Sequence, residues 1–344
     1  MGAPRHSQQV AGRKGKDADL DTLDELTYLL ESGSDRIGAL DFQRSPTEYV
    51  PRAAQAATLE ELLHAAEKVE KGITLTPELD QALFHGSSIG GARPKAMIVD
   101  GDRKLIAKFS SSTDTHNVVK AEYVAMRLAA KAGLDSAKVQ LEHVAGKDVL
   151  LVERFDRVKV ENGWERKAMV SALTLFGLDE MMARYASYED LAEIIRHRFT
   201  APKATLHELF GRLVFNVLCG NTDDHARNHA GFWDGKQLTL TPAYDICPQN
   251  RAGNEASQAM LIVDNKRMST LATCLEAAPH FQLSKKAAED IIEQQITAIQ
   301  AGWEEVCEEA TLSGVERRLL GQRIFFNPFI FEGSAERLRA DELA

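Results

Sequence analysis

The chain contains few cysteines and no long apolar stretch. Its 4 cysteines, among 344 residues, lie far apart and form no Cys-x-x-Cys pair. This spacing argues against a zinc cage and against a disulfide framework, and it favours a reducing, cytoplasmic location. No run is long enough to span a bilayer, and the polar first residues lack the apolar centre of a signal peptide. The sequence therefore predicts a chain that is neither secreted nor inserted into a membrane.

Positive charge is in the minority, because the formal net charge is −10. An acidic balance argues against strong non-specific attraction to nucleic acid or to an anionic membrane. Any contact with DNA is therefore expected to need a partner protein. The hydrophobic content of 44% is sufficient to bury the core of one large domain or of two closely packed lobes.

The first half of the chain follows a polar, aperiodic segment at residues 1–20, which predicts a disordered leader. The clearest signal after it is a hairpin at residues 96–109, where two short apolar runs are joined at Asp100 and Gly101. The other elements expected here are helices at about 20–30, 59–71 and 118–134 and a buried strand at 149–155.

The second half has mostly helical periodicity, interrupted by one hairpin near residues 232–240. The expected helices cover residues 188–199, 206–218 and 287–309. The sequence thus predicts an α+β, bilobal fold with a strand-rich N-terminal lobe and a mostly helical C-terminal lobe. The expected parts are a leader over 1–20, a first lobe over 21–155, a second lobe over 156–335 and a tail over 336–344.

The segment at residues 220–245 contains two acids and one amide around the predicted hairpin, and it reads GNTDDHARN, GFW, DGK, LTL and PAYDI. In phosphoryl transfer, one Asp orients the attacking hydroxyl, an Asn five positions later holds Mg²⁺, and a second Asp beyond a hairpin makes the other metal contact. Asp223, Asn228 and Asp245 have this spacing. The pentapeptide NTDDH alone is more typical of a polar turn, so the full set of three carries the prediction.

Asp224 and His225 leave a different chemistry open. Adjacent acids and histidines are also metal ligands in hydrolases that activate water. The chain shows no second cluster of His or carboxylate residues with ligand spacing. A metal-dependent hydrolase is therefore the weaker of the two enzyme hypotheses.

A loop rich in Gly and Ser precedes the first hairpin and reads HGSSIGGARPK. Its backbone amides can approach phosphate oxygens closely, although a plain tight turn reads the same. It is not a Walker loop, because that pattern requires Lys and then Ser or Thr directly after its last Gly. The candidate nucleotide-binding residues of this loop are Ser87, Ser88, Gly90, Gly91 and Lys95.

Lys108 lies among apolar neighbours in LIAKF, so its ammonium is expected to leave a largely buried strand and to need an anion. Nucleotide phosphates and Glu122, on the following helix, are the candidate partners. Glu153 and Phe155, in VERF, lie where a hinge between two lobes would contact adenine. The alternative for each charged residue is an ordinary solvated position.

Together these segments resemble the HipA-like serine/threonine kinases, the toxin components of type II toxin–antitoxin pairs. The blocks that carry the resemblance are GSSIGGARPKA with LIAKF, AEYVAMRLAAKAGL, LVERFDR, and GNTDDHARNHAGFW with LTPAYDI. The resemblance implies a protein-kinase-like fold, ATP and Mg²⁺ as cofactors, and transfer to a Ser or Thr of a protein. It makes Asp223 the catalytic base, Asn228 and Asp245 the metal ligands, and Lys108 the phosphate-binding lysine.

The resemblance has further implications. Glu153 and Phe155 become part of the adenine hinge, His225 joins the nucleotide site, and Ser88 becomes a serine whose autophosphorylation expels the Gly-rich loop. The implied partners are a helix-turn-helix antitoxin, DNA through that antitoxin, and a protein substrate; the family's substrates include aminoacyl-tRNA synthetases. A catalytically silent co-repressor remains the alternative. The family's usual N-terminal β-rich subdomain is expected to be missing, since only residues 28–42 resemble its closing portion.

Overall fold

The structure is a computed structural model, and it divides into two compact units. The first unit comprises Met1–Thr115 and Gln140–Ala168, and the second comprises His116–Val139 and Met169–Ala344. The residues that the structure describes are 25–52, 57–71, 73, 75–76, 79, 93, 95–111, 114, 116–251, 253, 255–338, 340 and 343. Among them, no helix has both the length and the apolar character that crossing a membrane requires.

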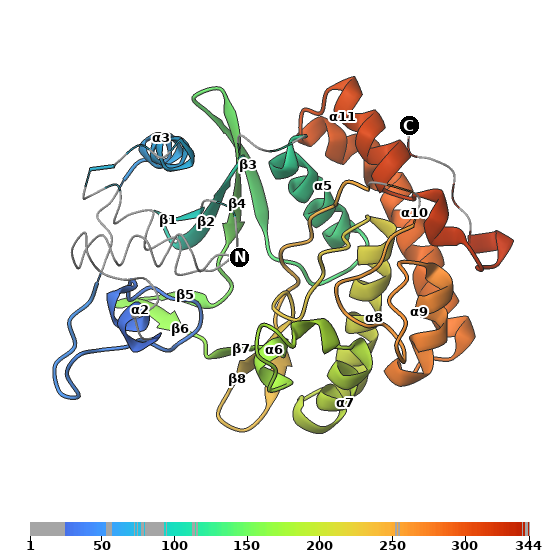
Figure 1. The fold of residues 1–344 in the computed structure, drawn as a ribbon, viewed down its shortest axis with the longest axis horizontal. Helices are drawn as coiled ribbons and strands as arrows, with labels where there is room; N and C mark the ends of the chain where they lie inside the picture. The colour runs from blue at the N-terminus through green and yellow to red at the C-terminus, as the bar shows by residue number, and fades with distance from the viewer. Residues whose placement is uncertain are drawn as a thin grey trace. The chain divides into compact units, whose positions relative to one another are not determined.

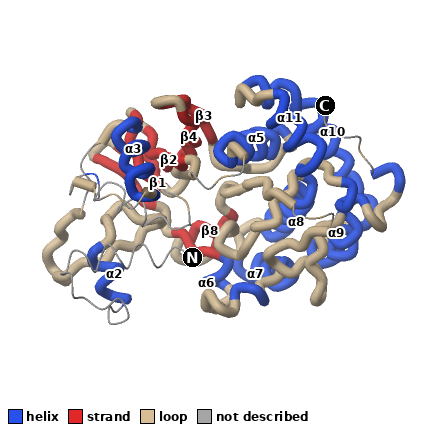
Figure 2. The backbone as a smooth tube through the Cα atoms, turned by 45° about the horizontal axis from the view of Figure 1, so that its top comes forward, coloured by secondary structure: helices blue, strands red, loops and turns tan. Residues whose placement is uncertain are grey.

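The first unit is built on an antiparallel sheet whose strand order is β1-β2-β4-β3. Alternate residues of β2, Leu105, Ala107 and Phe109, are fully buried on one face, which is the pattern of a strand covered on that side. Helix α3 covers this face (Figure 2), and its apolar side joins Leu62 and Leu63 to the same core. The strands are β1 Lys95–Asp100, β2 Arg103–Phe109, β3 Val139–Val144 and β4 Lys147–Glu153, and the helix is α3 Leu59–Glu70.

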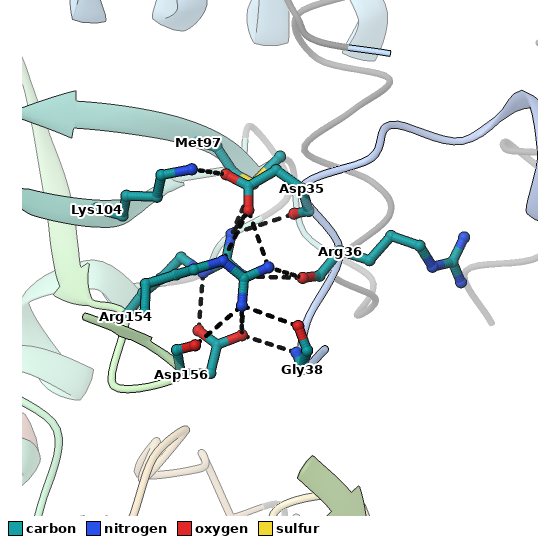
Figure 3. Close-up of polar contacts among 8 residues, drawn as sticks. Asp35, Arg36, Gly38, Met97, Lys104, Arg154 and Asp156 are labelled. Carbon is teal, nitrogen blue, oxygen red and sulfur yellow. Dashed lines mark hydrogen bonds and ion pairs between the residues drawn. The ribbon is translucent and has the colours of Figure 1, made fainter. Parts of the chain in front are cut away.

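The first unit also contains helix α2, Glu25–Glu31, and a hairpin of β5, Arg157–Val160, with β6, Gly163–Arg166. A buried charged cluster joins the segment after α2 to the end of β4 (Figure 3). Its members are Asp35, Arg36, Gly38, Met97, Lys104, Arg154, Asp156 and Arg157.

Asp156 is the centre of this cluster. Its carboxylate accepts hydrogen bonds from Arg154 at 2.9 and 3.0 Å, from Arg157 at 2.9 Å and from the Gly38 amide at 2.8 Å. Burial would raise the pKa of Asp156, but the hydrogen bonds and charge of Arg154 outweigh it and hold the pKa below its usual value. The resulting stabilisation is present above the usual pKa of an Asp, and it is lost as the pH falls through the lower pKa of the folded chain.

The second unit is mostly helical. Figure 1 shows α8, α9 and α10 side by side, and their apolar faces form its core. This unit also contains a three-stranded sheet in the order β7-β8-β9. The elements are α5 Val118–Lys131, β7 Met169–Ser171, α6 Ala172–Leu175, α7 Tyr188–Arg198, α8 Pro202–Leu218, β8 Ala230–Trp233, β9 Leu238–Leu240, α9 Leu271–Ala277, α10 Lys285–Glu309 and α11 Gly314–Leu319.

The predicted α+β class is confirmed, while the division of the chain into units differs from the expected change of lobe near residue 155. Helix α5 belongs to the second unit, where its side chains bind the end of α10: Arg127 donates two hydrogen bonds of 2.9 Å to Glu309. The β5–β6 hairpin belongs to the first unit, because Arg157 at its start is part of the buried charged cluster. Both differences come from contacts between segments far apart in the sequence, which local periodicity does not reveal.

The cluster around Asp156 generates a stability prediction. Asp156→Ala removes the more deeply buried of the two carboxylates that pair with Arg154 and Arg157, each 1% exposed, and leaves these guanidinium groups only Asp35. Breaking a buried ion pair by removing one partner costs about 3–5 kcal/mol, so we expect a loss of that order in the free energy of unfolding of the first unit. The measurement is urea unfolding of the full chain.

Asp100→Ala is the matched control, because Asp100 forms a solvent-exposed ion pair with Arg103 in the same unit. An exposed pair contributes less than about 1 kcal/mol, so this variant should unfold close to the parent. Equal losses for the two variants would contradict the account of the cluster.

Candidate functional site

The candidate catalytic loop begins where α8 ends. Helix α8 is buried along its apolar face, with Leu213, Val217 and Leu218 fully enclosed, so the prediction that it anchors the loop in the core is confirmed. The helix ends at Leu218 and the chain turns at Gly220, whose φ is +71°, a conformation that favours glycine. The Gly220 carbonyl then accepts a hydrogen bond of 3.0 Å from the Gln249 amide. The start of the loop is therefore tied to the segment that follows Asp245.

Asp223 and Asn228 lie at the two ends of a tight turn. The Asn228 side-chain amide donates a hydrogen bond of 3.3 Å to the Asp223 carbonyl, and the Asn228 backbone amide donates one of 2.8 Å to the His225 carbonyl. The first of these bonds orients the side chain of Asn228 and leaves its Oδ1 as the end that can accept or ligate. Asp223 is exposed and Asn228 is buried. The turn thus holds an accessible carboxylate beside an oriented amide.

Asp245 reaches the same region from the far side of the β8–β9 hairpin. Its φ is +61°, in the left-handed region that few residues with a side chain adopt and that Asp tolerates better than most. The neighbouring Tyr244 donates a hydrogen bond of 2.6 Å to the carbonyl of Arg227, inside the loop. The backbone at Asp245 is thereby fixed to the turn that contains Asp223 and Asn228.

The electrostatics of Asp223 place Asp245 near it. Partial loss of hydration raises the pKa of Asp223; the charge of His225 opposes this rise, and the negative charges of Asp245 and Asp224 add to it. Although the side chain is accessible, it therefore lies in a crowded, acidic environment. Perturbed acids of this kind are typical of functional sites. Asp223, Asn228 and Asp245, separate in the sequence, are brought together in the second unit.

Asp224 has a different environment from its neighbour. It is 2% exposed, and its carboxylate contacts Tyr188 and His229, with 3.0 Å from Asp224 Oδ1 to His229 Nε2. This is a correction to the hydrolase hypothesis, which paired Asp224 with His225 as open metal ligands. Among the described residues no group of three or more His, Cys, Asp or Glu could hold a metal ion. The partners of Asp224 were missed, although HARNH places His229 directly after Asn228.

The first unit supplies the predicted lysines. The register of β1 and β2 places Lys95 directly opposite Lys108, so both side chains leave the same face of the sheet. This is the face opposite α3, because the residues on either side of Lys108 point into the core beneath that helix. Lys108 is half-buried, as its apolar neighbours predicted. Two ammonium groups on adjacent strands suit a polyanionic ligand such as phosphate.

The other predicted nucleotide-binding residues do not all lie beside Lys95 and Lys108. Glu153 is the last residue of β4 and lies opposite Leu105, on the face that α3 covers, so it does not share the face of Lys108. Phe155 follows in the turn after β4, and Glu122 is buried on α5 in the second unit. The pairing of Glu122 with Lys108 stays a prediction. Residues Ser87, Ser88, Gly90 and Gly91 lie outside the described part of the chain.

Comparison with known proteins identifies relatives of this arrangement. A family model described as "HipA-like C-terminal domain" matches residues 87–303, more than half of the chain. The curated relatives include the Sinorhizobium fredii protein named "Putative kinase Y4mE", 29% identical over 175 residues, which cover 46% of this chain and 41% of the relative. They also include the serine/threonine-protein kinase toxin HipA of Shewanella oneidensis, 23% identical over 283 residues, which cover 70% of this chain and 64% of the relative.

The chain therefore spans less than two thirds of the length of either curated relative. A solved structure, the complex of Shewanella oneidensis HipA with HipB and its operator DNA, matches with a TM-score of 0.71 and 19% identity. The match covers 92% of this chain and 79% of the solved chain. It confirms the predicted α+β, protein-kinase-like fold.

The contact at Gly220 generates a prediction about how the loop is held. A Cβ at this position would meet the Ile324 carbonyl oxygen at 2.9 Å and Ile324 Cγ2 at 3.0 Å. We expect Gly220→Ala to lower the stability of the second unit by roughly 1–3 kcal/mol beyond the cost of its backbone strain. Thermal and urea unfolding measure this loss.

Gly177→Ala is the control, because Gly177 has a φ of +67° and a Cβ there would meet nothing within 4 Å. The two variants share the backbone strain and differ in the clash with Ile324. If Gly177→Ala proved as destabilising as Gly220→Ala, the contact would have no part in holding the loop.

Proposed function

This chain belongs to the HipA-like C-terminal domain family, and on that premise we propose that it is a Mg·ATP-dependent kinase for Ser or Thr residues of proteins. The observation that carries the proposal is the turn at residues 223–228, in which the Asn228 side chain bonds to the Asp223 carbonyl and to which Tyr244, next to Asp245, is tied through the Arg227 carbonyl. Phosphoryl transfer depends mainly on positioning and charge neutralisation. A rigid turn that carries an acid and an amide is suited to both.

The residues present fit a magnesium ion. Mg²⁺ usually takes one or two protein oxygen ligands and completes its shell with water and substrate phosphates, so a closed cluster of three protein ligands is not needed. Asn228 Oδ1 and the Asp245 carboxylate are the oxygens that would hold it. Partial loss of hydration is the main cause of the raised pKa of Asp223, and the negative charges of Asp245 and Asp224 add to it; a nearby cation would offset those charges. When bound, Mg²⁺ would neutralise charge on the phosphates of ATP.

The other residues of the proposed site contact the substrate hydroxyl, the phosphates or Asp223. Asp223, accessible at the end of the turn, accepts a hydrogen bond from the substrate hydroxyl. This bond directs the hydroxyl oxygen toward the γ-phosphoryl group of ATP. Lys108 and Lys95, on one face of the sheet in the first unit, bind phosphate oxygens of ATP. His225 lies inside the turn, where its charge lowers the pKa of Asp223 and so favours the ionised form that accepts the hydroxyl proton.

The proposal also includes an antitoxin, DNA contacted through it, and a protein substrate. In the matched Shewanella oneidensis structure, HipA is in a complex with HipB and its operator DNA. By analogy we propose that this chain binds a helix-turn-helix antitoxin and acts as the toxin of the pair, with DNA contacted through the antitoxin because the chain is acidic. A protein of the aminoacyl-tRNA synthetase class is the proposed type of substrate.

The catalytic role of Asp223 is tested by Asp223→Asn. Loss of a base in this position should reduce transfer from ATP by at least about 100-fold. Because the pKa of Asp223 is raised in the folded chain, the ionised carboxylate destabilises the fold above that pKa, and the amide should leave the chain equally or more stable at neutral pH. Phosphate transfer and thermal unfolding of the same preparation measure both effects.

Asp234→Asn is the matched control in the turn of the β8–β9 hairpin. Hydrogen bonds from the amides of Gln237 and Lys236 lower the pKa of this exposed Asp, so the substitution should reduce stability and leave transfer unchanged. Normal transfer by Asp223→Asn would remove the catalytic assignment.

Self-phosphorylation is expected at Ser88. After incubation with Mg·ATP, intact-mass and phosphopeptide analysis should locate one added phosphate on the peptide that contains Ser87 and Ser88. Ser88→Ala should abolish this phosphate and Ser87→Ala should retain it, while Asp223→Asn should show none. A phosphate that purified Asp223→Asn gains on this peptide during the incubation would show transfer without Asp223 and would contradict the assignment.

A further inference from the structure

A buried polar cluster lies directly behind the candidate catalytic loop, and it consists of Asp224, His229 and Tyr188. The side chains of Asp224 and His229 are each 3% exposed, and Tyr188 is fully enclosed. His229 Nε2 lies 3.0 Å from Asp224 Oδ1 and 3.2 Å from Asp224 Oδ2, and the Tyr188 hydroxyl donates a hydrogen bond to the same carboxylate. The Tyr188 hydroxyl and the His229 imidazole thus both contact the Asp224 carboxylate, which is buried away from water.

Two members of the cluster are the sequence neighbours of proposed functional residues. Asp224 directly follows Asp223, and His229 directly follows Asn228. The contact between Asp224 and His229 therefore joins the two ends of the turn on its buried side. On the other side, the hydrogen bond from Asn228 to the Asp223 carbonyl joins the same two ends. Together the two links leave the turn little freedom to change the separation of Asp223 and Asn228.

Tyr188 connects the cluster to the rigid part of the second unit. It is the first residue of α7, and its ring packs against His229 at 5.4 Å and against Phe281 at 6.4 Å between centroids. Phe281 in turn packs against Phe210 of α8 at 5.3 Å. The cluster is thereby fixed to two helices, one of which leads into the loop. A site is held accurately when its supporting side chains are themselves locked in this way.

The cluster is polar where apolar packing would serve stability as well. Burial raises the pKa of Asp224, but the charge and hydrogen bond of His229 and the hydrogen bond of Tyr188 outweigh it and keep the pKa below its usual value. His229 Nδ1 is buried and has no hydrogen-bond partner among the described residues. Buried ion pairs are often no more stable than apolar replacements, and an unsatisfied ring nitrogen adds a penalty. An unfavourable arrangement at this place points to a task other than stability.

We propose that Asp224, His229 and Tyr188 are positioning residues that fix the separation of Asp223 and Asn228 and so set the rate of phosphoryl transfer. The inference rests on the proposed kinase function. The three side chains do not contact the substrate. Loosening the cluster should therefore slow the transfer step, because small displacements at a reacting centre reduce rates strongly, while the affinity for ATP, to which Lys95 and Lys108 are also proposed to contribute, should change little.

The test uses the full chain and two conservative variants. Tyr188→Phe removes a single hydroxyl from the cluster, and Asp224→Asn removes its charge but keeps its shape. Ile299→Val, in the buried core on α10, is the control for a general loosening of the second unit. Each chain is compared with the parent in two measurements: hydrogen–deuterium exchange of peptides over residues 222–229 without nucleotide, and kcat and KM for ATP.

We expect both cluster variants to exchange faster over residues 222–229 and to lose about 10- to 100-fold in kcat, with KM for ATP changed by less than about threefold. Ile299→Val should match the parent in both measurements. Should Asp224→Asn fail to fold, Tyr188→Phe decides the question alone. A residue with only a structural role would lower the melting temperature but leave kcat per folded molecule unchanged.

The possible results distinguish failure of the positioning role from failure of the kinase function. If the parent transfers phosphate and the cluster variants keep its kcat, or if exchange over residues 222–229 is unchanged, the positioning role is overturned and the kinase function stands. If the parent does not transfer phosphate with any protein acceptor or with itself, the kinase function fails, and the positioning role fails with it.

Discussion

The ionised carboxylate of Asp224, enclosed in the helical unit, is the constraint on which the candidate site depends. A charge removed from water must be matched by nearby groups, and His229 and Tyr188 match it here. Because Asp224 and His229 lie at the two ends of the loop and Tyr188 is the first residue of α7, the contacts that stabilise the charge also fix the backbone. The accessible Asp223 is therefore presented by a backbone with little freedom, which is what a reaction governed by positioning requires.

The strand-rich unit also contains a buried carboxylate that is matched by nearby cations. There the enclosed charge is Asp156, matched by Arg154 and Arg157, and the cluster joins the segment near Gly38 to the end of β4. This leaves Lys95 and Lys108 on the sheet face away from α3, so positive charge is presented where apolar packing is not needed. In both units a buried carboxylate connects segments that are distant in the sequence.

Much of this could be predicted from the sequence. Apolar periodicity located α3, α7, α8 and the β1–β2 hairpin, since these elements bury one face each and their patterns are strong. The triad Asp223, Asn228 and Asp245 followed from spacing. The contacts of Tyr188 with Asp224 and of Gly38 with Asp156 did not, because these residues lie far from the carboxylates in the sequence and no local pattern encodes such contacts. The assignment of α5 to the helical unit was missed for the same reason, since α5 packs against α10, which is far away in the chain.

The most direct test of the central claim is a crystal structure of the full chain with Mg²⁺ and a non-hydrolysable ATP analogue. The account predicts a metal ion bound to Asn228 and Asp245, phosphate oxygens on Lys108, and the Asp223 carboxylate facing the γ-phosphate without ligating the metal. Asp224 should remain with His229 and Tyr188, away from the ion. A metal bound to Asp224 and His225, or a nucleotide that contacts none of Asp223, Asn228 and Asp245, would contradict it.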